Sequence, residues 1–121
     1  MLGLLLFLQA ALSIPEEIRE KILPFYEATI QSNDAWAACL FDTGATYNKQ
    51  DIPVTQVIDT AFGACKGLEL VHDGRTRRMF RELGDDGTRA RRVMAEAKAM
   101  IREIMLSDFT NSRIMRGRKI D

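Results

Sequence analysis

The sequence contains little of what most catalytic sites are built from: one histidine, two cysteines and no recognisable cofactor motif among 121 residues. No Ser or Thr lies in a nucleophile-elbow context, and no glycine-rich loop could cradle a phosphate. For general-base chemistry, His72 has only the adjacent Asp73 as a partner that the sequence itself proposes. We therefore do not expect an enzyme, and we expect no cofactor.

Metal-binding patterns are lacking as well. Cys39, Cys65, His72 and Asp73 are residue types that bind zinc, but zinc motifs pair their ligands closely, as in C-x2-C or H-x3-H, and neither spacing occurs. Asp85-Asp86 lacks the D-x-D-x-D-G ladder and the closing Glu of a calcium loop. The sequence predicts no metal site.

Proline and clusters of β-branched residues are scarce, and this scarcity favours helices. Only three prolines occur, whereas Ala, Leu, Met, Glu and Arg are frequent. Hydrophobic residues make up 46% and charged residues 28%, which is typical of one soluble globular domain. The predicted fold class is all-α, a compact bundle of four to five helices over residues 14–110.

Hydrophobic periodicity and capping residues place the first helices. A helix over 15–31 should be kinked or divided at Pro24. Ser32-Asn33-Asp34 should end that helix and cap a second one over 34–47. A third helix should begin at Pro53 and stop near Gly74.

The remainder of the chain contains one more long periodic segment. A short helix or turn over 75–83 should be broken by Gly84-Asp85-Asp86-Gly87. Thr88 should cap the last helix, whose apolar face extends to about Ser107. Residues 111–121 lack periodicity and should form a basic flexible tail.

Cys39 and Cys65 both lie in apolar runs rich in small residues. Disulfide-linked Cα atoms are ~4.4–6.8 Å apart, closer than the ~8–10 Å between packed helix axes, so bridged helices need small neighbours. The flanking residues meet this need (Ala35, Ala37, Ala38, Ala61, Gly63, Ala64 and Gly67). We predict a Cys39–Cys65 disulfide that links an antiparallel helical hairpin; two buried free thiols are the alternative.

Residues 1–13 have the pattern of a signal peptide. Leu2 to Leu8 are apolar apart from Gly3, and Ala11-Leu12-Ser13 is a small-x-small site for cleavage before Ile14. The run is shorter than the ~20 residues that span a bilayer, so we expect no stable membrane span once it is removed. The sequence therefore predicts a secreted or periplasmic protein. Alternatively, Ser13 and Glu16 form a capping box, the leader is kept as an apolar arm, and the protein is cytoplasmic.

Charge is zero overall but unevenly distributed. Residues 1–74 carry four basic and ten acidic side chains, whereas residues 75–121 carry thirteen basic and seven acidic ones. Two arginine groups flank the glycine turn, the second at a helix start where cations oppose the dipole. They could form an anion site, with Arg75, Arg77, Arg78, Arg89, Arg91 and Arg92 as candidates; pairing of the arginines, including Arg81, with acidic side chains is the simpler interpretation.

These observations favour a small exported, disulfide-stabilised helical protein that acts by binding or assembly, with a protein partner or a second copy. A cytosolic protein that binds an anion or nucleic acid through 75–92 is the alternative. We do not expect nucleic-acid binding, because aromatic side chains for base stacking are missing beside the arginines. An enzyme using His72 and Asp73 is a third hypothesis.

Overall fold

High helix propensity is expressed as four α-helices in the part of the chain that the structure describes. The computed structural model describes residues 15–120, and the side chains of residues 15–117. The helices are α2 (Glu16–Tyr47), α3 (Val54–Ala64), α4 (Lys66–Glu82) and α5 (Thr88–Ile120), and no strand occurs in this part of the chain. The predicted all-α bundle and its disulfide are confirmed. The predicted signal peptide, residues 1–13, lies outside the described residues.

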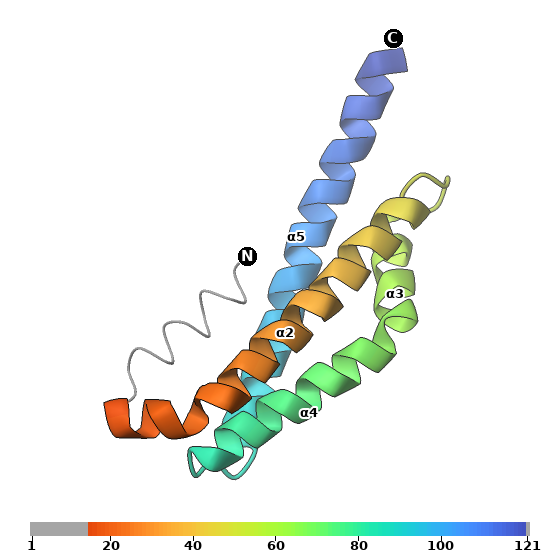
Figure 1. Cartoon of the computed structure of the whole chain (residues 1–121). Coiled ribbons are helices and arrows are strands. Elements are labelled where there is room, and N and C mark those ends of the chain that lie inside the picture. The colour runs from red at the N-terminus through yellow and green to blue at the C-terminus, as the bar shows by residue number, and fades with distance from the viewer. Residues whose placement is uncertain (1–14, 121) are drawn as a thin grey trace.

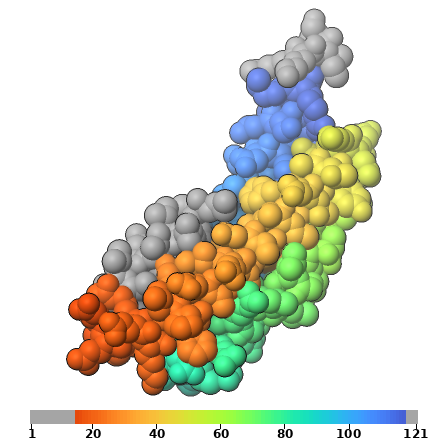
Figure 2. Space-filling view, in the orientation of Figure 1, coloured from red at the N-terminus to blue at the C-terminus, as the bar shows by residue number. Residues whose placement is uncertain are grey.

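The helices form an elongated bundle in which α2 contacts each of the other three. In Figure 1, α3 and α4 run back along α2 in succession, and α5 returns in the direction of α2. The C-terminal turns of α5 extend beyond the ends of α2 and α3, as the space-filling view also shows (Figure 2). The molecule therefore has a packed body and a projecting helical end.

Helix α2 is continuous, so the predicted break at Ser32-Asn33-Asp34 is wrong. Ser32 and Asn33 are buried rather than free to cap a helix. The Ser32 hydroxyl instead donates to the carbonyl of Thr29 at 2.9 Å, one helical turn back. Pro24 lies inside the helix, and the first turns of α2 run at an angle to the rest (Figure 1), which agrees with the predicted kink.

The predicted third helix is interrupted at Cys65, where α3 ends and α4 begins. The interruption is a bend rather than a loop, because Cys65 N still bonds to Ala61 O and Glu69 N to Cys65 O, at 3.0 and 3.1 Å. The stop predicted near Gly74 and the separate helix over 75–83 are also wrong, because α4 passes through Gly74 to Glu82. Among the described glycines only Gly84 and Gly87 have positive φ, and they mark the predicted turn.

The predicted loose tail over 111–121 is helical as far as Ile120. Buried Asn48, which follows α2, holds this end of α5. Its Nδ2 donates to Phe109 O at 3.1 Å, and its Oδ1 accepts from Arg113 Nε at 2.7 Å. Arg116 donates to the Asn48 carbonyl at 2.8 Å. This end of α5 has no periodic apolar face, and hydrogen bonds to Asn48 hold it in place instead.

Two hydrophobic clusters hold the helices together. The larger one surrounds Trp36 and Leu40 of α2 and includes residues of α3 and α5. The smaller one joins Met79 and Phe80 of α4 to Ala90 of α5. Of the apolar face predicted for the last helix, the buried members are Ala90, Met94, Ala97 and Met105. The bend at Cys65 lets α3 and α4 follow α2 along its length.

Candidate functional site

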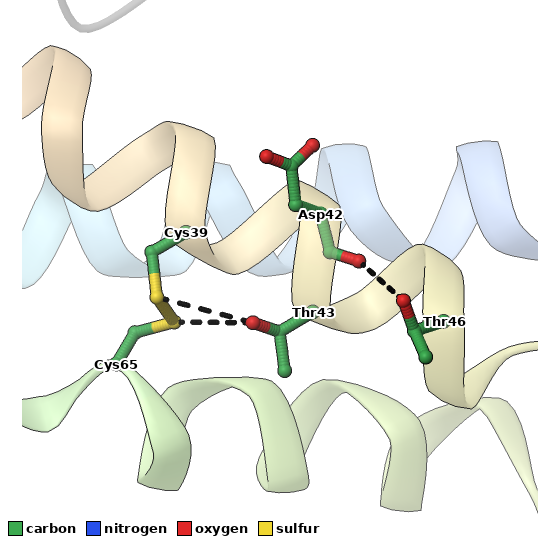
Figure 3. The surroundings of a disulfide bond; sticks show 5 residues. All are labelled: Cys39, Asp42, Thr43, Thr46 and Cys65. Atoms are coloured by element: carbon green, nitrogen blue, oxygen red, sulfur yellow. Dashed lines mark hydrogen bonds between the residues drawn. A yellow bond between two sulfur atoms is a disulfide. The ribbon is translucent and has the colours of Figure 1, made fainter.

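A disulfide joins Cys39 of α2 to Cys65 at the α3–α4 bend. The two Cα atoms are 6.0 Å apart, and the two residues are 26 positions apart in the chain. Figure 3 shows Thr43, one turn after Cys39, with its hydroxyl facing both sulfurs at 3.9 and 3.7 Å. Because disulfide sulfurs carry no hydrogen, the Thr43 hydroxyl is the donor, and its single hydrogen is shared between these two weak contacts.

The small residues around the cysteines have different roles. Ala37 and Ala61 are buried between the helices. Gly63 and Gly67, in contrast, border open space, because a Cβ added to either would meet nothing within 4 Å. The predicted need for small residues on every side of the bridge therefore holds for the buried alanines and not for these glycines.

A buried polar cluster lies between α2 and α4. His72 Nδ1 is 2.9 Å from Ser32 Oγ, and its ring stacks on Trp36 with centroids 5.7 Å apart. Thr76 Oγ1 donates to the His72 carbonyl at 2.8 Å, and Thr29 Oγ1 donates to the Phe25 carbonyl at 2.7 Å. These hydrogen bonds satisfy several of the buried polar groups where the two helices come together, although the indole Nε1–H of Trp36 has no hydrogen-bond acceptor among the described residues.

This Ser–His pair differs from a catalytic pair in direction and in access. When the Ser32 hydroxyl donates its hydrogen to Thr29 O, the Nδ1-protonated tautomer of His72 is the one that bonds to Ser32 Oγ, with His72 as the donor. An activated serine would require the opposite direction, with the imidazole as acceptor. The exposed fraction of His72 is 0% and that of Ser32 is 4%. The geometry therefore gives this pair a structural role.

Burial lowers the pKa of His72 to about 4, with a smaller lowering from Arg75, although Asp73 and the Thr29 backbone act in the opposite direction. The imidazole is therefore neutral at pH 7. The neighbouring Glu69 behaves differently: its burial raises the pKa, but Lys66 and Lys98 outweigh burial and lower it overall. The Glu69 carboxylate lies 2.7 Å from Lys66 Nζ and 3.3 Å from Lys98 Nζ, so it links α4 to α5.

The six arginines predicted as an anion site do not lie together in the structure. Arg75 and Arg78 face α2: Arg75 donates to Ala28 O at 3.0 Å, and the Arg78 guanidinium lies 5.1 Å from the centroid of the Phe25 ring. Arg89 and Arg92 are exposed on the first turns of α5. Only Arg77 and Arg91 are brought to one place.

Arg81, which was not among the predicted site residues, completes that place. Arg77, Arg81 and Arg91 line a surface pocket of about 320 Å³, together with Asp85, Asp86 and Gly87. The spacing of Arg77 and Arg81 was the available signal, because residues four apart in a helix share a face. Arg77 Nε forms an ion pair with Asp73 Oδ2 at 2.9 Å.

The two aspartates of this pocket cap α5, in place of the predicted Thr88 cap. Asp85 Oδ2 accepts from Gly87 N at 2.9 Å, and Asp86 Oδ1 accepts from Thr88 N at 3.0 Å. Hydrogen bonds from the backbone and then the side chain of Thr88 lower the pKa of Asp86. The positive end of the helix dipole is thus already occupied by carboxylates.

Within residues 15–120, no three His, Cys, Asp or Glu side chains are grouped so as to hold a metal ion. The sulfurs of Cys39 and Cys65, two of the residue types that bind zinc, are joined in the disulfide. No helix in the same range combines the length and apolar character that a membrane crossing requires.

Comparison of the chain with protein-family models, with curated proteins and with solved structures found no match.

Proposed function

We propose that this chain is a small exported protein whose helices are stabilised by the Cys39–Cys65 disulfide and which acts by binding or assembly. The disulfide is the observation that carries the proposal, because disulfides form and persist in oxidising compartments and are rare in the cytosol. The signal-like pattern of residues 1–13 supports the same compartment. Secreted or periplasmic localisation follows from the two together.

Binding or assembly is supported by the surface. Several large apolar side chains are exposed on all the longer helices (Ile18, Leu23, Leu68, Leu70, Val71, Leu106, Ile114 and Met115). Such side chains offer contact area to a protein partner or a second copy. The only histidine is enclosed between α2 and α4 and bonded to Ser32, where no substrate reaches it.

Mass spectrometry of the non-reduced protein purified from its native host tests the export proposal. We expect a chain that begins at Ile14 and lacks two hydrogen atoms relative to the dithiol form. Alkylation before reduction should modify neither cysteine. A Cys39→Ser/Cys65→Ser variant is the matched control, since it should be cleaved at the same site but carry no disulfide. An intact Met1 with two alkylatable thiols would contradict the proposal.

A further inference from the structure

The pocket between the C-terminal part of α4 and the start of α5 collects positive charge from both helices. We propose that Arg77, Arg81 and Arg91 form a binding site for a doubly charged tetrahedral oxyanion, of the phosphate or phosphomonoester class. This inference rests on the proposal that the protein acts by binding, and it adds a ligand class. It does not depend on export.

The argument begins with the convergence of the three side chains. Arg77 and Arg81 are one turn apart on α4, and Arg91 lies in the first turn of α5, across the Gly84–Gly87 turn. All three line the same pocket of about 320 Å³. A carboxylate has two oxygens and is satisfied by one guanidinium fork, whereas a tetrahedral oxyanion has oxygens for several forks arriving from different directions.

Two of the three guanidinium groups are available to a ligand. Within residues 15–117, the ion pair formed by this trio is the one between Arg77 and Asp73, and it uses Nε of Arg77. Arg81 and Arg91 make no ion pair there within 4 Å, so an anion would not have to break an ion pair with either of them. The charge of Arg91 does act on Asp86, whose pKa is lowered mainly by hydrogen bonds from Thr88 and to a smaller extent by Arg91. A Cβ at Gly87 would lie 3.8 Å from Arg91 Nη1, an ordinary contact distance, which places the Arg91 guanidinium beside this turn.

The aspartates of the pocket do not fill the site. Asp85 and Asp86 accept hydrogen bonds from backbone amides at the start of α5, at residues 87–90. Their oxygens are thus directed at the helix end, and they fix the turn that places Arg91 opposite α4. We accordingly assign the oxyanion to the arginine side chains and not to the amides of the helix.

The remaining arginines serve as internal controls. Arg75 and Arg78 are held against α2 by Ala28 O and the Phe25 ring. Arg89 and Arg92 flank Arg91 in sequence but do not line the pocket. Substitution of Arg92 therefore removes the same charge, from the same helical turn, without removing a residue of the site.

Titration of the full oxidised chain with inorganic phosphate, followed by ¹H–¹⁵N NMR at pH 7.5 and constant ionic strength, tests the site. We expect saturable shifts at the amides of residues 84–91 and at the side-chain N–H groups of Arg81 and Arg91. Arg81→Gln and Arg91→Gln should each raise the dissociation constant for phosphate about tenfold or more, as expected for loss of a charge-assisted hydrogen bond. Arg92→Gln and Arg89→Gln should leave the dissociation constant within about twofold of that of the unsubstituted chain, because these side chains are outside the pocket.

A parallel titration with O-phosphoserine distinguishes a phosphomonoester from inorganic phosphate as the ligand. Saturable binding of either compound that is lost in Arg81→Gln supports the site. The compound with the lower dissociation constant shows whether the ligand is free phosphate or a phosphomonoester. Shifts that grow linearly without saturation for both compounds, or equal weakening in all four variants, would overturn it. A retained leader or reduced cysteines in the host would refute export alone, since the phosphate titration is done on the oxidised chain.

Discussion

Asn48 Oδ1 lies 2.7 Å from the Nε of Arg113, a residue 65 positions further along the chain. Asn48 is buried at the end of α2, and Arg113 belongs to the part of α5 that projects from the bundle. The same amide side chain also donates to Phe109 O. One asparagine therefore joins the end of the first described helix to the last one.

Asn48→Ala should loosen the C-terminal part of α5. The substitution removes both side-chain hydrogen bonds and leaves the guanidinium of Arg113 without this acceptor, so we expect a loss of about 1.5–3 kcal/mol, the range for a hydrogen bond to a charged group. Amide hydrogen exchange should accelerate over residues 109–117 more than over α3. Asn111→Ala, at an exposed position of the same helix, is the control and should change neither. Uniform acceleration throughout the chain would contradict a local role.

The cysteine pairing illustrates how far sequence reasoning reached. Small residues around Cys39 and Cys65 predicted the disulfide, and the pair is joined. However, Cys65 lies at a bend between helices rather than in the middle of one, and Gly63 and Gly67 border open space. The predicted pair is therefore correct, but of the small flanking residues on which the prediction rested, only Ala37 and Ala61 are buried.

Helix ends were predicted less well, because distant partners decide them. Ser32 and Asn33 have the side chains of a helix cap, but both are buried, and Ser32 bonds within α2 and to His72 of α4. Likewise, residues 111–117 show no apolar stripe, and hydrogen bonds to Asn48 hold this part of α5 in place. The partners, His72 and Asn48, are distant in the sequence from the residues that they hold, so no local sequence pattern reveals them. The arginine pocket was missed in part for the same reason, since only the turn at 84–87 brings Arg91 to Arg77 and Arg81.

Acidification from pH 7 to pH 5 should destabilise the protein through His72. Its pKa is about 4 in the folded state and about 6.5 in the unfolded chain, so the unfolded state binds the proton first as pH falls. The contribution of neutral His72 to the free energy of unfolding is therefore fully present above pH 6.5. It is lost as the pH falls from 6.5 to 4, and the loss is about 2 kcal/mol at pH 5. Urea denaturation at several pH values measures this loss. In His72→Gln the dependence between pH 7 and pH 5 should largely disappear; an unchanged slope would assign it to another group.

Reduction of the disulfide should lower the free energy of unfolding by about 3–4 kcal/mol. This estimate is the chain-entropy value for a closed loop of 26 residues. The urea midpoint should fall on addition of dithiothreitol, and a Cys39→Ala/Cys65→Ala variant should start from the lower midpoint and show no further response. If the reductant moved both midpoints equally, the effect would not come from the bridge.

Gly44→Ala tests the close approach of α2 and α5. An added Cβ would lie 2.5 Å from Cε2 and Cζ of the Phe109 ring and 3.2 Å from Met105 Cε, so the buried ring must shift. Overpacking of this kind costs about 1–3 kcal/mol, which outweighs the roughly 1 kcal/mol that alanine gains over glycine in a helix. Gly74→Ala in α4 provides the opposite sign: nothing lies within 4 Å of its Cβ position, so only the propensity gain remains. Urea midpoints should therefore fall for Gly44→Ala and rise for Gly74→Ala, and a rise for both would mean that Phe109 yields without cost.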